Sequence, residues 1–123
     1  LIKNYENKKD FLKKVHINKV VEETFTKIKN TRMFEEFVTI VCNLEMGAKE
    51  IKDYEVSDES DSVKGKFKLK EKRRFKFDDG SYRYIFRHMK NFSNGYRMYF
   101  EEKKDKIIIC YFGKHLSTKK HKN

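Results

Sequence analysis

The residues best suited to chemistry in this sequence are arginines and histidines in its C-terminal part. Metal-free cleavage of RNA needs a base for the 2′-hydroxyl proton, an acid for the leaving oxygen, and cations for the charge that builds on phosphorus. A guanidinium fork matches phosphate oxygens, and imidazole titrates near neutral pH. Arginine can therefore supply the cations, and histidine the acid and the base. The candidate catalytic residues are Arg83, Arg97, His115 and His121.

A second set of residues could bind the backbone and bases of an RNA. From Lys66 to Lys76 a cation occupies every even position, which predicts a strand with six cations on one face. Tyrosine rings can stack on unpaired bases. A lysine such as Lys70 or Lys114 can also carry the proton if neighbouring cations lower its pKa. The candidate RNA-binding residues are Lys66, Lys68, Lys70, Arg74, Tyr82, Tyr84, Arg87, Tyr99 and Lys114.

Each candidate also has a purely structural interpretation. Arg97 can balance Glu101 or a cross-strand acid, and the lysine row can be a sheet edge that blocks aggregation. Tyrosine and phenylalanine at alternating positions can pack in a core instead of holding bases. His16 and His88 belong to no motif, so we expect them at the surface. The sequence alone leaves these alternatives open.

Charge is divided unevenly along the 123-residue chain. Residues 1–63 carry 11 Lys/Arg and 13 Asp/Glu, a net charge of −2, whereas residues 64–123 carry 19 and 6, a net charge of +13. Cations gathered in one half are typical of proteins that neutralise phosphates. An acidic protein or an anionic membrane surface would fit the same charge. We therefore expect a polyanionic partner, with RNA as the leading candidate.

The sequence gives little support for a disulfide, a metal site or a membrane-spanning segment. Cys42 and Cys110 each lie in an apolar run, so we expect them in the core and not in a disulfide. The sequence has no His-Glu-x-x-His or Cys-x-x-Cys motif, and we expect no metal and no cofactor. No apolar run approaches the roughly 20 residues that span a bilayer, and residues 1–10 are too polar for a signal peptide. We expect a soluble, cytoplasmic protein without a membrane role.

Apolar spacing divides the chain into a helical part and a sheet. Residues 11–28 have helical spacing, and Asn30-Thr31 offers an N-cap for a second helix that ends near Gly47. After Gly65 the period changes to two, and Asp79-Gly80 and Asn94-Gly95 are typical hairpin turns. The predicted strands are 66–77, 82–87, 96–100 and 106–112.

These elements predict an α+β fold in which an N-terminal helical hairpin packs on a four-stranded antiparallel sheet. The length fits a single domain over residues 1–123. Its parts would be a helical part at 1–50, an acidic loop at 51–63, a basic antiparallel sheet at 64–113 and a basic tail at 114–123.

The last third of the sequence resembles a family of bacterial toxins. The motifs are Tyr82-Arg83 followed by Arg87, then Gly95-Tyr96-Arg97-Met98-Tyr99-Phe100, then an apolar strand that runs into Gly113-Lys114-His115, and finally His121. Their order and spacing are similar to those of the RelE/YoeB/HigB group of type II toxins in the RelE/ParE superfamily. The resemblance implies a RelE-like fold, cleavage of messenger RNA on the ribosome as an mRNA interferase, and a neutralising acidic antitoxin.

The chain departs from the family pattern in several places. The strand that usually precedes the helices has only residues 1–5 as its counterpart, and the strand at 66–77 is an addition. His115 stands where the family has Arg after Gly-Lys. ParE-like members act on gyrase without cleaving RNA. Three functions stay open: a metal-independent endoribonuclease, a non-catalytic nucleic-acid-binding module, and an interaction domain for an acidic protein or membrane surface.

Overall fold

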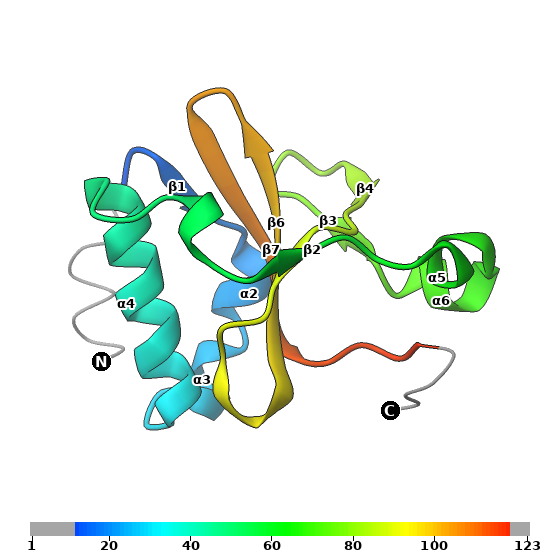
Figure 1. The fold of residues 1–123 in the computed structure, drawn as a ribbon, viewed down its shortest axis with the longest axis horizontal. Helices are drawn as coiled ribbons and strands as arrows, with labels where there is room; N and C mark the ends of the chain where they lie inside the picture. The colour runs from blue at the N-terminus through cyan, green and yellow to red at the C-terminus, as the bar shows by residue number, and fades with distance from the viewer. Residues whose placement is uncertain (1–11, 119–123) are drawn as a thin grey trace.

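The computed structural model describes residues 12–118, which form an α+β fold around a mixed five-stranded sheet (Figure 1). Strand β1 runs parallel to β7, and the other neighbours are antiparallel. The strand order is β1-β7-β6-β5-β2, with bounds β1 Val15–Ile17, β2 Val56–Ser57, β5 His88–Met89, β6 Tyr96–Lys103 and β7 Lys106–Lys114. A separate antiparallel hairpin pairs β3 Arg74–Lys76 with β4 Tyr82–Tyr84.

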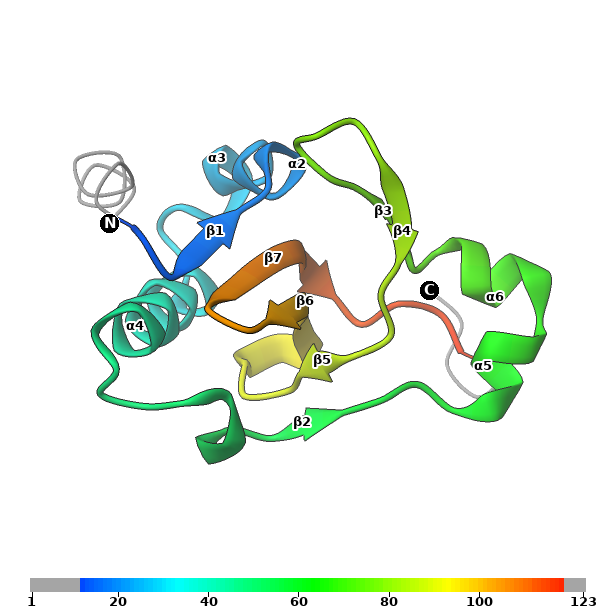
Figure 2. The same ribbon diagram turned by 90° about the horizontal axis from the view of Figure 1, so that it is seen from above.

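The predicted second helix is confirmed as α4, Arg32–Met46, which packs on one side of the sheet (Figure 2). The hydroxyl of Thr31 accepts a hydrogen bond from the amide of Phe34 and so caps the first turn. Gly47 ends the helix in the left-handed region, at φ 73°. The apolar stripe of α4 forms most of its contact with the sheet, and Phe34 is fully buried. Across residues 12–118, no helix is long and apolar enough to cross a membrane.

The predicted first helix is wrong over its N-terminal part, and the predicted N-terminal hairpin does not form. Val15 and Ile17 are buried on either side of exposed His16, an alternation that suits β1. β1 pairs with residues 107–109 in the first half of β7, so that this apolar part of β7 has a neighbouring strand on each side. Two short helices follow, α2 Lys19–Glu22 and α3 Phe25–Ile28.

The predicted four-stranded antiparallel sheet is also corrected. Three strands of the sheet are additional: β1, whose pairing with β7 makes the sheet mixed, and β5 and β2, which follow β6 toward the opposite edge. The predicted strand at 82–87 is confirmed only over β4, since residues 85–87 lie in no strand, and β4 belongs to the separate hairpin. The strands predicted at 96–100 and 106–112 are confirmed as the longer β6 and β7. Both predicted turn glycines, Gly80 and Gly95, have positive φ.

The predicted lysine-rich strand at 66–77 is largely helical. Only β3 is extended, while α6 spans Phe67–Glu71. Residues 66–72 have no neighbouring strand to pair with, and lysine, leucine and glutamate, which are not branched at Cβ, favour a helix. The six cations therefore do not share one strand face.

Residues 58–73 form a small projection from the sheet, which we call the helical lobe (Figure 1). It holds α5, Asp61–Gly65, and α6, and it begins within the segment that was predicted as an acidic loop at 51–63. That segment also contains a short 3-10 helix, η2 Ile51–Asp53, and strand β2. Ser60 caps α5 by accepting from the amide of Val63, which is fully buried. The C-terminal tail runs from β7 toward this lobe (Figure 1).

The β3–β4 hairpin covers part of the sheet face opposite α4. Phe75, Phe77 and Ile85 pack there against Tyr99 and Cys110 in a second apolar cluster. Cys110 is buried as predicted, and burial raises the pKa of its thiol to about 12. The hairpin leaves the remainder of this face to the lobe and the tail.

A substitution in the main core tests the packing between α4 and the sheet. The ring of Phe112 lies 4.6 Å from that of Phe37 and 4.9 Å from that of Phe92, measured between centroids. We expect Phe112→Ala to lower the free energy of unfolding by about 3–5 kcal/mol in a urea titration, because it leaves a cavity. The control Phe67→Ala removes a ring that is 74% exposed and should change it by less than about 0.5 kcal/mol. Equal losses would contradict this packing.

Candidate functional site

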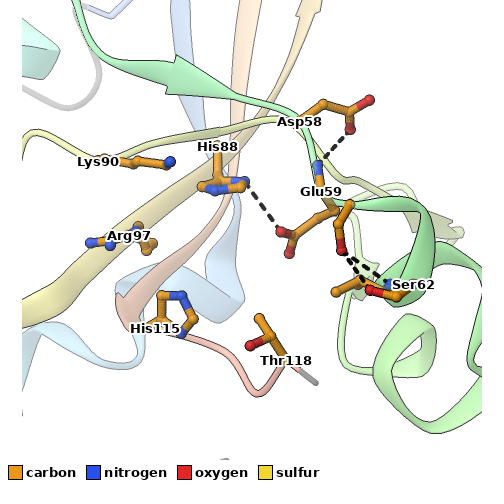
Figure 3. Close-up of a pocket in the computed structure, with 10 residues that line it drawn as sticks. Asp58, Glu59, Ser62, His88, Lys90, Arg97, His115 and Thr118 are labelled. Carbon is orange, nitrogen blue, oxygen red and sulfur yellow. Dashed lines mark hydrogen bonds and ion pairs between the residues drawn. The ribbon is translucent and has the colours of Figure 1, made fainter. Parts of the chain in front are cut away.

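A pocket of about 350 Å³ lies where the sheet, the helical lobe and the C-terminal tail meet (Figure 3). This volume falls in the range of roughly 300–1,000 Å³ that small-molecule sites occupy. The sheet side and the tail contribute nitrogen-bearing side chains, and the lobe contributes carboxylates and hydroxyls. The lining residues are Asp58, Glu59, Ser60, Ser62, Val63, His88, Lys90, Arg97, His115 and Thr118.

The pocket brings together Arg97 and His115, two residues that the sequence singled out as catalytic candidates. Arg97 lies on β6 opposite Gly113 of β7, two residues before His115. The amide of His115 donates to the carbonyl of Gly95 at 2.9 Å, which fixes the start of the tail against the turn before β6. The guanidinium of Arg97 donates from Nη1 to the carbonyl of Tyr96, and its buried Nε has no partner among residues 12–118. Within the described residues, Arg97 therefore has an N–H donor without a hydrogen-bond acceptor.

Glycine at position 113 leaves room for the side chain of Tyr111, which crosses over it. The Tyr111 hydroxyl donates to the carbonyl of Lys114 at 2.7 Å, so its ring lies across Gly113. A Cβ at position 113 would lie 2.7 Å from the Tyr111 hydroxyl oxygen. This close approach gives a physical reason for the glycine of the Gly113-Lys114-His115 motif.

His88 is the most constrained histidine of the pocket, and its expected position at the surface is wrong. It lies on β5 between β6 and β2, is 5% exposed, and stacks on the ring of Tyr99 with centroids 4.8 Å apart. Its Nδ1 lies 3.0 Å from the carbonyl oxygen of Phe86, which can only accept. Nδ1 therefore carries the proton of the neutral ring, and Nε2 is left as an acceptor.

The environment of His88 favours the neutral imidazole. Burial lowers the pKa of His88 below the ordinary 6.5, although the Phe86 carbonyl and the carboxylate of Glu59, 4.0 Å from Nδ1, oppose this. No residue in the described range 12–118 bonds to Nε2. A neutral ring with an open acceptor nitrogen in a pocket can take a proton from a bound group.

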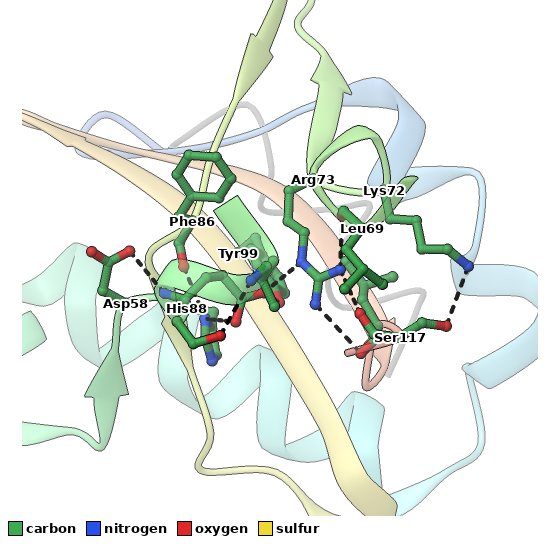
Figure 4. A network of polar contacts seen from close by, with 12 residues as sticks. Asp58, Leu69, Lys72, Arg73, Phe86, His88, Tyr99 and Ser117 are labelled. Atoms are coloured by element: carbon green, nitrogen blue, oxygen red, sulfur yellow. Dashed lines mark hydrogen bonds and ion pairs between the residues drawn. The ribbon is translucent and has the colours of Figure 1, made fainter. Parts of the chain in front are cut away.

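Glu59 connects the lobe to the sheet through a buried network (Figure 4). Its Oε2 accepts from Nε of Arg73 at 2.5 Å and from the hydroxyl of Tyr99 at 2.6 Å. Both members of the ion pair are buried, with Arg73 at 0% and Glu59 at 7% side-chain exposure. Burial and the bond to Glu59 raise the pKa of Tyr99 far above its ordinary value, so the phenol remains a donor.

Arg73 also holds the C-terminal tail. Its Nη1 donates to the carbonyls of Leu69 at 3.0 Å and Ser117 at 2.7 Å, and its Nη2 donates to that of Leu116 at 3.4 Å. One guanidinium thus joins the lobe, the sheet through Glu59, and the tail that carries His115 (Figure 4).

Arg83, another candidate catalytic residue, does not line this pocket. Arg83 donates to both oxygens of Glu101, at 2.8 and 3.1 Å, and lies 3.6 Å from the centroid of the Phe77 ring. The structural interpretation of the sequence, in which Arg97 balances Glu101, is therefore wrong, because Glu101 is paired with Arg83. His121 lies outside the described residues.

The candidate RNA-binding residues do not line the pocket. One of them is buried in the core, and the others lie on two separate surfaces. Tyr99 is 2% exposed, so the prediction that it stacks on bases is wrong. Arg87 pairs with Glu102 at 2.5 Å on the exposed side of the sheet, and Lys114 is exposed at the end of β7. The others lie on the lobe and the β3–β4 hairpin: Lys66, Lys68, Lys70, Arg74, Tyr82 and Tyr84.

Sequence reasoning missed four residues of the site. His88 and Lys90 flank Met89 in a polar stretch and belong to no motif. Glu59 is one of several carboxylates in an acidic stretch, and Arg73 is one of many cations in a basic stretch. The one available signal is that an acidic stretch and a basic stretch occur in the same chain, which could suggest a buried ion pair between one residue of each.

Comparison with known proteins finds no matching family model, curated protein or solved structure. The functional argument therefore depends on the geometry of the pocket. Its nitrogen-bearing groups are one guanidinium, one ammonium and two imidazoles, from Arg97, Lys90, His88 and His115. Cations of this kind bind phosphate, and imidazoles move protons at neutral pH. Within residues 12–118, no group of three or more His, Cys, Asp or Glu side chains is arranged to hold a metal ion.

The buried ion pair can be tested through stability. We expect Glu59→Gln to lower the free energy of unfolding by about 3–5 kcal/mol, because it leaves the charge of Arg73 buried without its counter-ion. The control Glu102→Gln breaks an exposed pair with Arg87 and should cost no more than about 1 kcal/mol. Denaturant titration of both variants measures the difference. A Glu59→Gln variant as stable as the control would show that the pair is not buried in solution.

The environment of His88 predicts its titration. NMR of the imidazole resonances should give His88 a pKa below 6.5, because burial disfavours the charged ring. Between that lowered value and 6.5 the unfolded state binds more protons than the folded state, so this residue's contribution to stability falls as the pH drops through that window. The His88→Gln variant should lose this part of the pH dependence. A titration midpoint at or above 6.5 would contradict the assignment.

Proposed function

We propose that the protein is a metal-independent endoribonuclease that cleaves messenger RNA in this pocket. The observation that carries the proposal is the presence of Arg97, His115, His88 and Lys90 around one cavity. Arg97 and His115 also belong to the sequence motifs that resemble those of RelE-like toxins, which act on ribosome-bound messenger RNA. The side chains of the pocket can supply the base, the acid and the cations of the reaction.

The roles follow from the surroundings of each group. The Nε2 atom of neutral His88 takes the proton of a 2′-hydroxyl, and the 2′-oxygen attacks the adjacent phosphorus. Arg97 and Lys90 stabilise the charge that develops on the phosphate oxygens. His115, as an imidazolium, gives a proton to the 5′-oxygen as the P–O5′ bond breaks. The products are a 2′,3′-cyclic phosphate and a free 5′-hydroxyl, and water is not consumed in this step.

An acidic protein partner fits the same surface. The C-terminal half of the chain has a net charge of +13, and a protein that neutralised it would compete with RNA for the cations of the pocket. We propose that the partner is an acidic antitoxin, as the resemblance to RelE-like toxins implies.

Cleavage of a labelled messenger RNA in EDTA, with and without translating ribosomes, tests the activity. We expect native protein to cleave, Arg97→Ala to be slower by about 10²–10³, and His88→Ala to be slower by about 10²–10⁴. The control His16→Ala removes an exposed imidazole that pairs with Asp78 and should cleave at the native rate. If native protein binds RNA in a salt-sensitive way but cleaves it in neither condition, the chain is a non-catalytic binding module. The absence of binding as well would indicate a protein target.

A further inference from the structure

The strand that leads to the pocket carries aromatic rings at alternate positions. Tyr82 and Tyr84 belong to β4, and Phe86 follows two residues later. The rings of Tyr84 and Phe86 are nearly parallel, with an interplanar angle of 16° and centroids 6.3 Å apart. Tyr82 is 51% exposed and Tyr84 is 38% exposed, although rings of this size usually bury most of their surface. These three residues form a row that we call the aromatic track.

Each ring of the aromatic track has a cation over it. The guanidinium carbon of Arg74 lies 4.3 Å from the centroid of the Tyr82 ring. The ammonium of Lys70 lies 4.5 Å from that of Tyr84, and the ammonium of Lys64 lies 5.4 Å from that of Phe86. All three cations come from the lobe and the residue that follows it, so a row of positive charge runs beside the row of rings.

Few carboxylates offset this charge. Residues 64–74 contain seven Lys/Arg and a single acid, Glu71, which accepts a hydrogen bond from the hydroxyl of Tyr84. Lys64 pairs with Asp58 at 2.6 Å, an exposed contact that is weak in water. Arg73 is the one cation of the segment that is fully buried in its ion pair with Glu59. The surface beside the track therefore remains strongly basic.

The segment that carries the aromatic track continues into the pocket wall. The backbone carbonyl of Phe86 fixes Nδ1 of His88, which lines the pocket two residues further along the chain (Figure 4). Asp58, the partner of Lys64, lines the same pocket.

We propose that the aromatic track binds single-stranded RNA and leads it into the pocket. Bases stack on the open faces of the rings, while the adjacent lysines and arginine contact the phosphates. Paired bases are already stacked within a duplex and cannot reach such rings, so the track selects unpaired strands. Stacking makes no hydrogen bonds to the edges of the bases, so the track accepts RNA of many sequences. This inference extends the proposed function, but binding along the track does not require cleavage.

Binding of a fluorescent single-stranded RNA with 2′-O-methyl groups, which cannot be cleaved, tests the track by anisotropy. The variant Tyr82→Ala/Tyr84→Ala should bind at least about tenfold more weakly than native protein, because it removes two stacking surfaces. The matched control Tyr82→Phe/Tyr84→Phe keeps both rings and should bind within about threefold of native. A duplex of the same sequence should bind more weakly than the single strand. An alanine variant with native affinity would overturn the proposal.

A second variant covers the case in which the alanine variant fails to fold. Lys70→Ala/Arg74→Ala keeps the rings and should lower the slope of log affinity against log salt by about 1.4, near 0.7 for each lost phosphate contact of a single strand. An unchanged slope would overturn the proposal. Native RNA affinity with weakened binding of polyglutamate would assign the surface to an acidic protein and would likewise overturn it. These experiments measure binding alone. If the protein binds RNA along the track but does not cleave it, the proposed function is refuted and the proposed role of the track is not.

Discussion

The buried ion pair between Arg73 and Glu59 is the interaction on which the pocket depends. Two charges removed from water are tolerated only where hydrogen bonds satisfy them, and here Tyr99 and three backbone carbonyls do so. The pair joins the two ends of the lobe, the hydrogen bond from Tyr99 to Glu59 fixes the lobe to the sheet, and the carbonyl contacts of Arg73 fix the tail to the lobe. The other polar contacts of the segment from α5 to α6, such as those of Lys64 with Asp58 and Glu71 with Tyr84, lie at the surface, and Val63 is its one buried apolar side chain. The ion pair therefore holds the lobe and the tail in the positions in which they line the pocket.

The same burial prepares the pocket for proton transfer. Tyr99 contributes one face of the space around His88 and also bonds to Glu59, so the ion pair and the imidazole share a support. Removing His88 from water makes its neutral form the stable one, whereas Arg97 on the adjacent strand keeps its charge. A neutral acceptor beside a permanent cation is the arrangement that attack by a 2′-hydroxyl on a phosphate requires. The lobe therefore has both a structural role and, in the proposed reaction, a functional one.

The parts of the fold that depend on local signals could be predicted from the sequence, and those that depend on distant pairing could not. Helix α4 carries its own cap and stripe, and β6 and β7 carry alternating or continuous apolar residues between turn dipeptides. The alternation of lysines from Lys66 to Lys76 was misleading because a strand also needs a neighbouring strand, and only residues 74–76 have one. Arg97 and His115 were found through their motif. His88 and Glu59 were not, because burial of a polar residue is decided by partners far away in the chain.

The most direct test of the account is whether an RNA phosphate occupies the pocket. NMR of the histidine side chains during titration with a 2′-O-methyl single-stranded RNA reports this without any need for turnover. The account predicts saturable changes in the imidazole signals of His88 and His115 that weaken with salt, while His16 on the opposite edge of the sheet stays unchanged. Saturable RNA binding that leaves both pocket histidines unperturbed would contradict it.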